Sequence, residues 1–510
     1  MSRITPIALG LALPVALMSQ AALADLSPAQ VWGDWRLYME GMGYQVNASE
    51  AASGGTLTVS DIQLRFAVPD QEGAVSMSMG TLLFSQNGDG SVSIVMPDQM
   101  PISITAAENG GDGDSVVANM TFAQTGHSMI ASGDPSSMTY AYTAATAALT
   151  LDQLIADGES FGPDNARVIL NGSGISSSTT MTIGDLRSYT QTGTIGALNY
   201  DVYIDNPAES AKVALKGSVE EIGLEGGGMI PLTLGNAADM SAMIRAGFDV
   251  SGKITYGSGN TDMTVTDPVN GDFSAQTTSQ GGALGVKMGA GGLSYDGAQT
   301  NLDMTVRVAD LPFPINISME RGAFNLFAPV TKSEQAQPFA FGLTLRNFKM
   351  SNMIWGIFDP TGQLPRDPAT LELDVTGRAK LGIDYLDPNA AAAMGAGGPG
   401  QFENVQINKL LLDAAGAKLE GNGDVAFDNT DFSTIPGMPK PVGQVNLSLV
   451  GGNALLDKLV AMGLLPQDQA MGARMMMGLF AVPGGAPDSL NSKIEFTDEG
   501  TILANGQRIN

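Results

Sequence analysis

The sequence predicts a mainly β protein, built as an elongated, curved antiparallel sheet with a few short helices at the N-terminus, in mid-chain and at the C-terminus. Apolar and polar residues alternate in short runs, for example at residues 75–79 and 92–96, which is the pattern of half-buried strands. Turn-forming residues separate these runs, as in the Asn-Gly-Asp-Gly sequence at residues 87–90. Successive strands joined by short turns predict a meander.

Glycine interrupts the alternation in several of the predicted strands. Val213 and Leu215 precede Gly217, and similar apolar alternations surround Gly377 and, more loosely, Gly421. A glycine inside a strand usually marks a bulge or a bend. We therefore expect these glycines to curve the sheet.

A helix is predicted directly before the first strands. Ser27 can cap this helix, Pro28 suits its first position, and Trp32 and Trp35 lie on one face, which predicts an anchoring contact with the core. Shorter helical patterns follow later in the chain. They cover residues 239–246, 351–358, 453–462 and 466–480.

The first 24 residues have the layout of a secretory signal. Arg3 precedes an apolar run at residues 7–18, and small residues then lead to Ala24. We expect export to the periplasm with cleavage after Ala24. Because a membrane-spanning helix needs about 20 apolar residues, no transmembrane anchor is expected after cleavage.

A second boundary is predicted inside the exported chain. Residues 389–401 are rich in alanine and glycine, which predicts a flexible loop. This loop divides the N-terminal helix and the curved β-sheet region, residues 25–388, from the C-terminal strands and helix pair, residues 402–510.

Composition limits the chemistry of this chain. A formal net charge of −27 disfavours nucleic acid and anionic lipid head groups as partners. The chain has no cysteine, and its one histidine, His127, lies in a turn sequence where we expect it to be exposed to solvent. We therefore predict no catalytic residues, no cofactor and no metal site.

An apolar stripe marks the last predicted helix. Met471, Met475, Leu479 and Phe480 recur at helical spacing. Such a stripe either packs in the core or offers an adaptable apolar surface, because methionine fits irregular partners. These four residues are the candidate contacts for a lipid or another apolar ligand.

Short motifs at both ends of the chain and in its last third point to a family. They are Pro28, Val31, Trp32 and Trp35, and the segments 354–360, 364–371, 455–459, 494–496 and 504–509. With these motifs the chain resembles an uncharacterised alphaproteobacterial envelope family, domain of unknown function 2125. That family is distantly similar to the AsmA-like periplasmic proteins. The resemblance implies a long curved sheet with an apolar groove, a role in lipid traffic, and no catalytic residues.

Three functions remain open at this point. The preferred one is a non-enzymatic periplasmic protein of the cell envelope that binds or shields a lipid or other apolar ligand in a curved-sheet groove. The alternative is a structural or assembly scaffold with a self-filled core and other envelope proteins as partners. A carboxylate-dependent glycan hydrolase is the least favoured, because nothing in the spacing of the acidic residues selects a pair.

Overall fold

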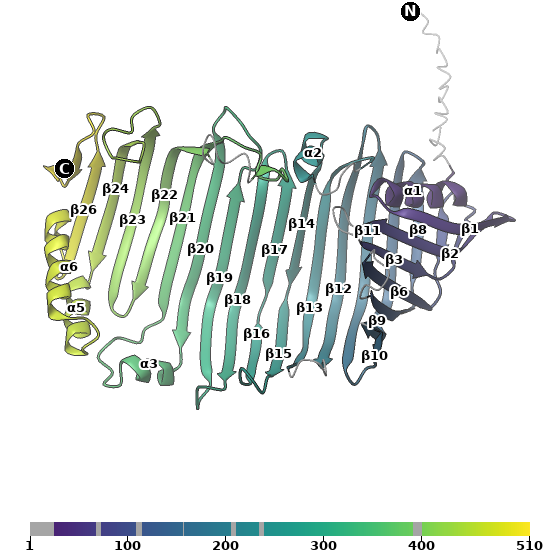
Figure 1. The fold of residues 1–510 in the computed structure, drawn as a ribbon, viewed down its shortest axis with the longest axis horizontal. Coiled ribbons are helices and arrows are strands. Elements are labelled where there is room, and N and C mark those ends of the chain that lie inside the picture. The colour runs from purple at the N-terminus through teal and green to yellow at the C-terminus, as the bar shows by residue number, and fades with distance from the viewer. Residues whose placement is uncertain are drawn as a thin grey trace, which may run out of the picture.

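The computed structural model of the chain describes residues 25–67, 73–108, 115–156, 158–205, 211–233, 239–390 and 400–509. These residues form one antiparallel sheet of 28 strands and five helices. Figure 1 shows the strands side by side along the long axis, with α1 near one end, α5 and α6 at the other, and α2 and α3 at the two rims. The predicted signal segment lies outside the described residues.

Strands account for most of the described residues. The first group is β1 (Gln45–Ser53), β2 (Thr56–Ala67), β3 (Gly73–Met79), β4 (Leu82–Gln86), β5 (Val92–Val95), β6 (Gln99–Glu108), β7 (Ser115–Thr125), β8 (Ser128–Asp134), β9 (Ser137–Ala156) and β10 (Glu159–Phe161). The middle group is β11 (Ala166–Ile183), β12 (Leu186–Asp205), β13 (Lys212–Pro231), β14 (Asp249–Tyr256), β15 (Ser258–Thr266), β16 (Phe273–Ser279), β17 (Gly282–Gly289), β18 (Gly292–Val308) and β19 (Ile315–Ala328). The last group is β20 (Gln337–Met350), β21 (Ala369–Leu381), β22 (Gly400–Ala414), β23 (Ala417–Asp428), β24 (Lys440–Val450), β25 (Val482–Pro483), β26 (Ser489–Phe496), β27 (Ile502–Ala504) and β28 (Gln507–Arg508).

The five described helices are short. They are α1 (Pro28–Gly41), α2 (Met240–Arg245), α3 (Asn352–Phe358), α5 (Gly452–Ala461) and α6 (Gln467–Phe480). The mainly β prediction is thus confirmed, and each predicted helix appears within a few residues of its expected bounds. At α1, the Ser27 side chain accepts a hydrogen bond from the Gln30 backbone and Pro28 occupies the first turn, as the sequence indicated.

The strands follow one another as a meander. From β18 to β24, each strand pairs antiparallel with its neighbour in the chain. Elsewhere two short strands share one long partner: β14 and β15 pair with different halves of β13, and β7 and β8 with different parts of β9. Because the pairing is unbroken, the predicted regions 25–388 and 402–510 belong to the same sheet.

The predicted boundary between those regions falls after β21. Residues 391–399 of the predicted loop lie outside the described part of the chain. Gly400 and Gln401, which we had assigned to the loop, begin β22 and pair with Leu381 and Lys380 at the end of β21.

The N-terminal end of the sheet has a conventional core. Val31 and Trp32 of α1 are buried against strands that include β2, β4 and β5, and Trp32 and Trp35 both contact the ring of Phe84. Phe84 itself is fully buried. This confirms that the two tryptophans anchor α1 to the core.

A line of backbone irregularities, which we call the crease, crosses the middle of the sheet. Gly174, Glu221, Asn301 and Asn347 have positive φ angles of 61°, 55°, 46° and 53°, and the strand register skips each of them. The facing residue of the partner strand is skipped as well, so the register of these pairs is the same on both sides of the crease. Only the β20–β21 pair shifts its register here, between Leu345 and Phe348. The crease is therefore a line of local backbone distortion that the neighbouring strands share.

The crease keeps apolar side chains on one face of the sheet. In β13, Val219 before Glu221 and Ile222 after it are both apolar, so the alternation shifts by one position at Glu221. The partner strand β12 shifts at the same place. Beside the crease, Ile222 and Leu302 are 7% and 8% exposed. Side chains on this face are therefore well covered beside the crease.

Two of the predicted glycine bends are wrong. Gly217 pairs regularly with Tyr200, and Gly377 with Phe339, and neither glycine has a positive φ angle. A β-carbon at Gly217 would overlap the Tyr200 ring, and one at Gly377 would overlap the Phe339 ring. These glycines make room for aromatic rings from the next strand. Near Gly421 the register does shift, as expected, because β22 carries one extra residue between Ile407 and Leu410.

No helix among the described residues is long and apolar enough to cross a membrane.

Candidate functional site

One face of the sheet is apolar over most of its length, and we call it the apolar face. Paired residues in an antiparallel sheet point to the same side, so the register identifies the rows of side chains on each face. One such row crosses ten strands from β14 to β26. It consists of Ile254, Leu284, Gly297, Phe324, Leu343, Leu373, Leu410, Gly421, Leu447 and Ser492.

The opposite face carries the charges. On it Glu372 lies between Arg346, at 2.6 Å, and Lys409. The hydrogen bonds from Lys409 and Arg346 hold the pKa of Glu372 below its usual range. Among the in-register residues of β11 to β24, Arg187 is the one charged residue on the apolar face. The two faces therefore differ sharply in polarity.

Two hollows lie in the apolar face. The first has a volume of about 490 Å³, lies beside the crease, and is lined by residues that include Tyr256, Leu284, Leu302, Phe324 and Leu343. The second, of about 440 Å³, lies nearer the α2 rim. Its lining includes Leu293, Val330, Phe339, Leu381 and Phe402.

The apolar face is exposed where no helix covers it. Ile254, Leu284 and Phe324 are 47%, 48% and 45% exposed, although they lie in mid-sheet. In the N-terminal core, by contrast, the equivalent face is sealed by α1. Monomeric proteins rarely expose a contiguous apolar surface of this extent without a binding function.

Covering elements close the N-terminal end and part of one rim. At the N-terminal end, Asp34 of α1 forms a buried ion pair of 2.6 Å with Arg187, which neutralises that one charge. At the α2 rim, the Asp384 carboxylate accepts hydrogen bonds from Arg245 of α2 and from the backbone of Lys332. The segment around Asp384 thus ties α2 to the loop after β19.

The candidate contacts predicted from the sequence lie at the C-terminal end. Met471, Met475 and Leu479 of α6 are 61%, 70% and 53% exposed. The carbonyl oxygen of Phe480 accepts a hydrogen bond of 2.6 Å from Ser492, the last residue of the apolar row. Met471, Met475 and Leu479 therefore form an exposed stripe beside the end of the apolar face, and Phe480 is half-buried. They line neither of the two apolar hollows.

His127 is not the exposed turn residue that we expected. Its side chain is 13% exposed, and its Nε2 lies 3.1 Å from the carbonyl oxygen of Met96. The turn between β7 and β8 packs back on the loop after β5, which covers the ring. Among the described residues, no group of His, Cys, Asp and Glu side chains could hold a metal ion.

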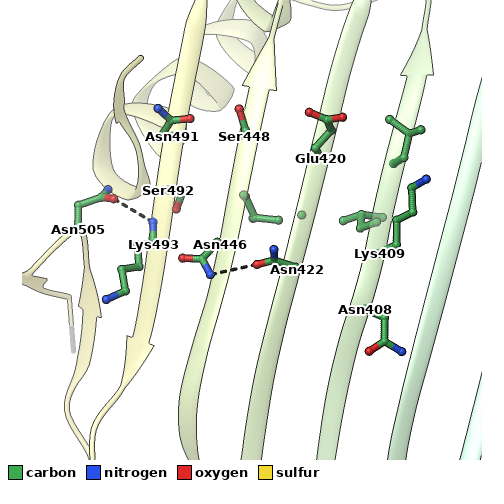
Figure 2. Close-up of a pocket in the computed structure, with 14 residues that line it drawn as sticks. Asn408, Lys409, Glu420, Asn422, Asn446, Ser448, Asn491, Ser492, Lys493 and Asn505 are labelled. Carbon is green, nitrogen blue, oxygen red and sulfur yellow. Dashed lines mark hydrogen bonds between the residues drawn. The ribbon is translucent and has the colours of Figure 1, made fainter. Parts of the chain in front are cut away.

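A third hollow, of about 520 Å³, lies near the C-terminal end, and its lining combines many polar side chains with Leu410, Leu411 and Leu447. Figure 2 shows its polar side chains, which come from β22, β23, β24 and β26. Asn446 donates a hydrogen bond of 3.1 Å to Asn422, and the Lys493 backbone donates one of 2.9 Å to Asn505. These groups satisfy one another, as is normal on the polar face of a sheet.

Sequence reasoning missed the residues of the apolar face. Strands β21 and β23 show the signal, because their charges occur at even positions and their apolar residues mainly at odd ones, as in Leu371 and Leu373 against Glu372. In β18, β19 and β20 the charges occur at both parities, because the crease shifts the alternation. The rows could not be assembled without the register, which depends on pairings between strands.

Residues 259–506 match the profile of a family described as an uncharacterized protein conserved in bacteria (DUF2125). The resemblance to that family is thereby confirmed for this part of the chain. It contains the second apolar hollow, and the lining of the first apart from Ile254 and Tyr256. A search of curated proteins gave no match to the chain.

Proposed function

We propose that this protein is an exported, non-enzymatic protein of the bacterial cell envelope that binds a lipid or another long-chain apolar ligand along the apolar face of its sheet. One observation carries the proposal: an uncharged apolar row crosses ten strands and stays partly exposed in mid-sheet. Such a surface gains free energy when an apolar ligand covers it.

The energetics favour a ligand that lies along the sheet. Burying apolar surface is worth about 25 cal/mol per Å², so covering a few hundred Å² yields several kcal/mol without any chemical step. The rings of Phe324 and Phe339 lie across Gly297 and Gly377, which keeps the floor of the face low. A low, apolar floor leaves room for a chain-like ligand.

The proposed location follows from the signal-like residues 1–24, with cleavage after Ala24. The proposed AsmA-like relationship agrees with a long single-layer sheet that has one apolar face. Both parts of the proposal place the protein in the periplasm, where it would shield a lipid from water.

A scaffold that assembles with other envelope proteins is the second candidate. The exposed stripe of Met471, Met475 and Leu479 favours it, because adaptable methionine side chains are frequent at protein contacts. In this case a protein partner, and not a lipid, would cover the apolar surface.

The test is mass spectrometry of lipids that co-purify with the native protein and with two variants. Phe324→Asp places a charge on the apolar face, whereas Asn325→Asp places the same charge one residue further on, on the polar face. We expect lipid with the native protein and Asn325→Asp, and its loss from Phe324→Asp at an unchanged melting temperature. Native protein free of lipid would contradict the proposal and favour the scaffold.

A further inference from the structure

We propose that the hollow beside the crease anchors the uncharged polar group of an amphiphilic ligand, through Tyr256, Gln299 and Ser279, while the ligand's hydrocarbon chain lies along the neighbouring apolar row. The inference rests on the proposed function and names the class of ligand: a long-chain amphiphile with a neutral polar group such as an ester, an amide or a hydroxyl.

The three side chains form one hydrogen-bonded cluster on the apolar face. Gln299 Nε2 donates to the Tyr256 hydroxyl at 3.0 Å, and that hydroxyl lies 3.2 Å from Ser279 Oγ. Ser279 is buried, and the Tyr256 ring lies across Gly282, where a β-carbon would overlap it. Gly282 thus lets the ring lie low, with the hydroxyl held at the crease.

The cluster keeps free hydrogen-bonding capacity that faces the hollow. Tyr256 and Gln299 both line it, together with apolar side chains such as Leu302, Phe324 and Leu345. Gln299 has a second amide hydrogen and a carbonyl oxygen for which the described residues provide no partner, beyond its bond to Tyr256. A neutral ligand group can therefore both donate to and accept from this cluster.

The uncharged lining of the hollow excludes ligands whose polar group is ionised. None of the described residues that line this hollow is an Asp, Glu, Lys or Arg. A carboxylate, phosphate or ammonium group would lose its hydration in the hollow and would meet no opposite charge there, which is strongly unfavourable. The protein's net charge of −27 adds a general repulsion of anions.

The adjacent row suits a hydrocarbon chain in length and polarity. From Ile254 through Phe324 to Leu343 it crosses five adjacent strands, so it spans about 19 Å at the usual spacing of about 4.8 Å between strands. The row begins at Ile254, which is the neighbour of Tyr256 on the same face of β14. A chain anchored at the cluster would thus run across the strands.

The test measures three probes against delipidated full-length protein at pH 8. Diphenylhexatriene, a fluorescent hydrocarbon, reports on the apolar face alone. Monopalmitoylglycerol and palmitate then compete with it; both carry the same acyl chain, but their polar groups are neutral and anionic. We expect monopalmitoylglycerol to bind at least tenfold more tightly than palmitate.

Two variants test whether Tyr256 and Gln299 cause the preference for monopalmitoylglycerol. Tyr256→Phe combined with Gln299→Leu removes the polar groups while keeping side-chain volume, and should weaken monopalmitoylglycerol about tenfold while diphenylhexatriene binds as before. Gln276→Leu is the control, because Gln276 bonds Asp262 on the polar face of the sheet. It should change neither ligand.

The outcomes distinguish the anchoring site from the proposed function of the apolar face. Equal affinity for the two competitors, or an unchanged affinity for monopalmitoylglycerol in the double variant, overturns the anchoring site and leaves the apolar face intact as a binding surface. Failure of the native protein to bind diphenylhexatriene overturns the proposed function itself, and the anchoring site with it.

Discussion

The Asp34 carboxylate holds α1 to the sheet through two buried partners. It accepts hydrogen bonds of 2.6 Å from Arg187 and 2.8 Å from the Tyr140 hydroxyl. Burial, followed by the negative charge of Asp34, raises the pKa of Tyr140 well above its usual value, so Tyr140 remains a donor. This triad joins α1, β9 and β12 across a long stretch of sequence.

Removal of the carboxylate should therefore be costly. Asp34→Ala leaves the Arg187 charge buried without its partner, which destabilises by about 3–5 kcal/mol in comparable cases. Urea unfolding followed by tryptophan fluorescence measures the change. Arg36→Ala on the same helix is the control, because Arg36 forms exposed pairs worth about 0–1 kcal/mol. Equal effects of the two variants would show that the triad does not fix α1.

At the scale of elements, the crease depends on residues that tolerate a left-handed backbone. Asn301 has a φ angle of 46° between β-strand halves, and its side-chain amide donates to Gln280 Oε1 at 2.9 Å. Asparagine and glycine adopt this conformation more readily than other residues, whereas a β-branched residue is strained there. The same holds for Asn347 in β20.

Substitution at Asn301 tests this account. Asn301→Val should destabilise by about 1–3 kcal/mol, because valine resists positive φ. Asn301→Gly keeps the backbone freedom and loses only the bond to Gln280, so it should lie within about 1 kcal/mol of the native protein. Thermal unfolding by circular dichroism compares the two. If valine and glycine are tolerated equally, the crease is not held by this position.

Helix α6 presents the stripe that the sequence selected. Because Met475 is 70% exposed, Met475→Asp should change the free energy of unfolding by no more than about 0.5 kcal/mol. A loss of several kcal/mol would instead show that the stripe packs in a core. The same preparation is analysed for bound lipid. Lipid loss at unchanged stability would extend the binding surface onto α6, and Asp468→Asn on the same helix is the control for a change of charge.

For the whole molecule, the sequence specified the class of fold but not its faces. Local sequence patterns predict the strand alternation, the Ser27 cap and the positions of all five described helices. The roles of Gly217 and Gly377 did not, because the rings that lie across them belong to other strands. The ligand hollow was missed for the same reason, since Tyr256 and Gln299 meet only through the pairing of β14, β17 and β18.

The uneven layering of the molecule predicts uneven local stability. Strands β2 and β4 are sealed by α1, whereas β14 and β17 have exposed apolar side chains, such as Ile254 and Leu284. In β13, three consecutive glycines, Gly226 to Gly228, add no side-chain packing. Elements with few buried apolar contacts open at lower free energy.

Hydrogen exchange measured by mass spectrometry should therefore be graded along the sheet. Amides of β2 and β4 should exchange at least about tenfold more slowly than those of β13, β14 and β17, a difference of about 1.4 kcal/mol in opening free energy. Monopalmitoylglycerol should slow exchange in the central strands and leave β2 and β4 unchanged, because binding stabilises the elements that it covers. If amides are protected equally along the whole sheet of the delipidated protein, the single-layer region is as stable as the N-terminal core. The exposed apolar face would then need no ligand for its stability.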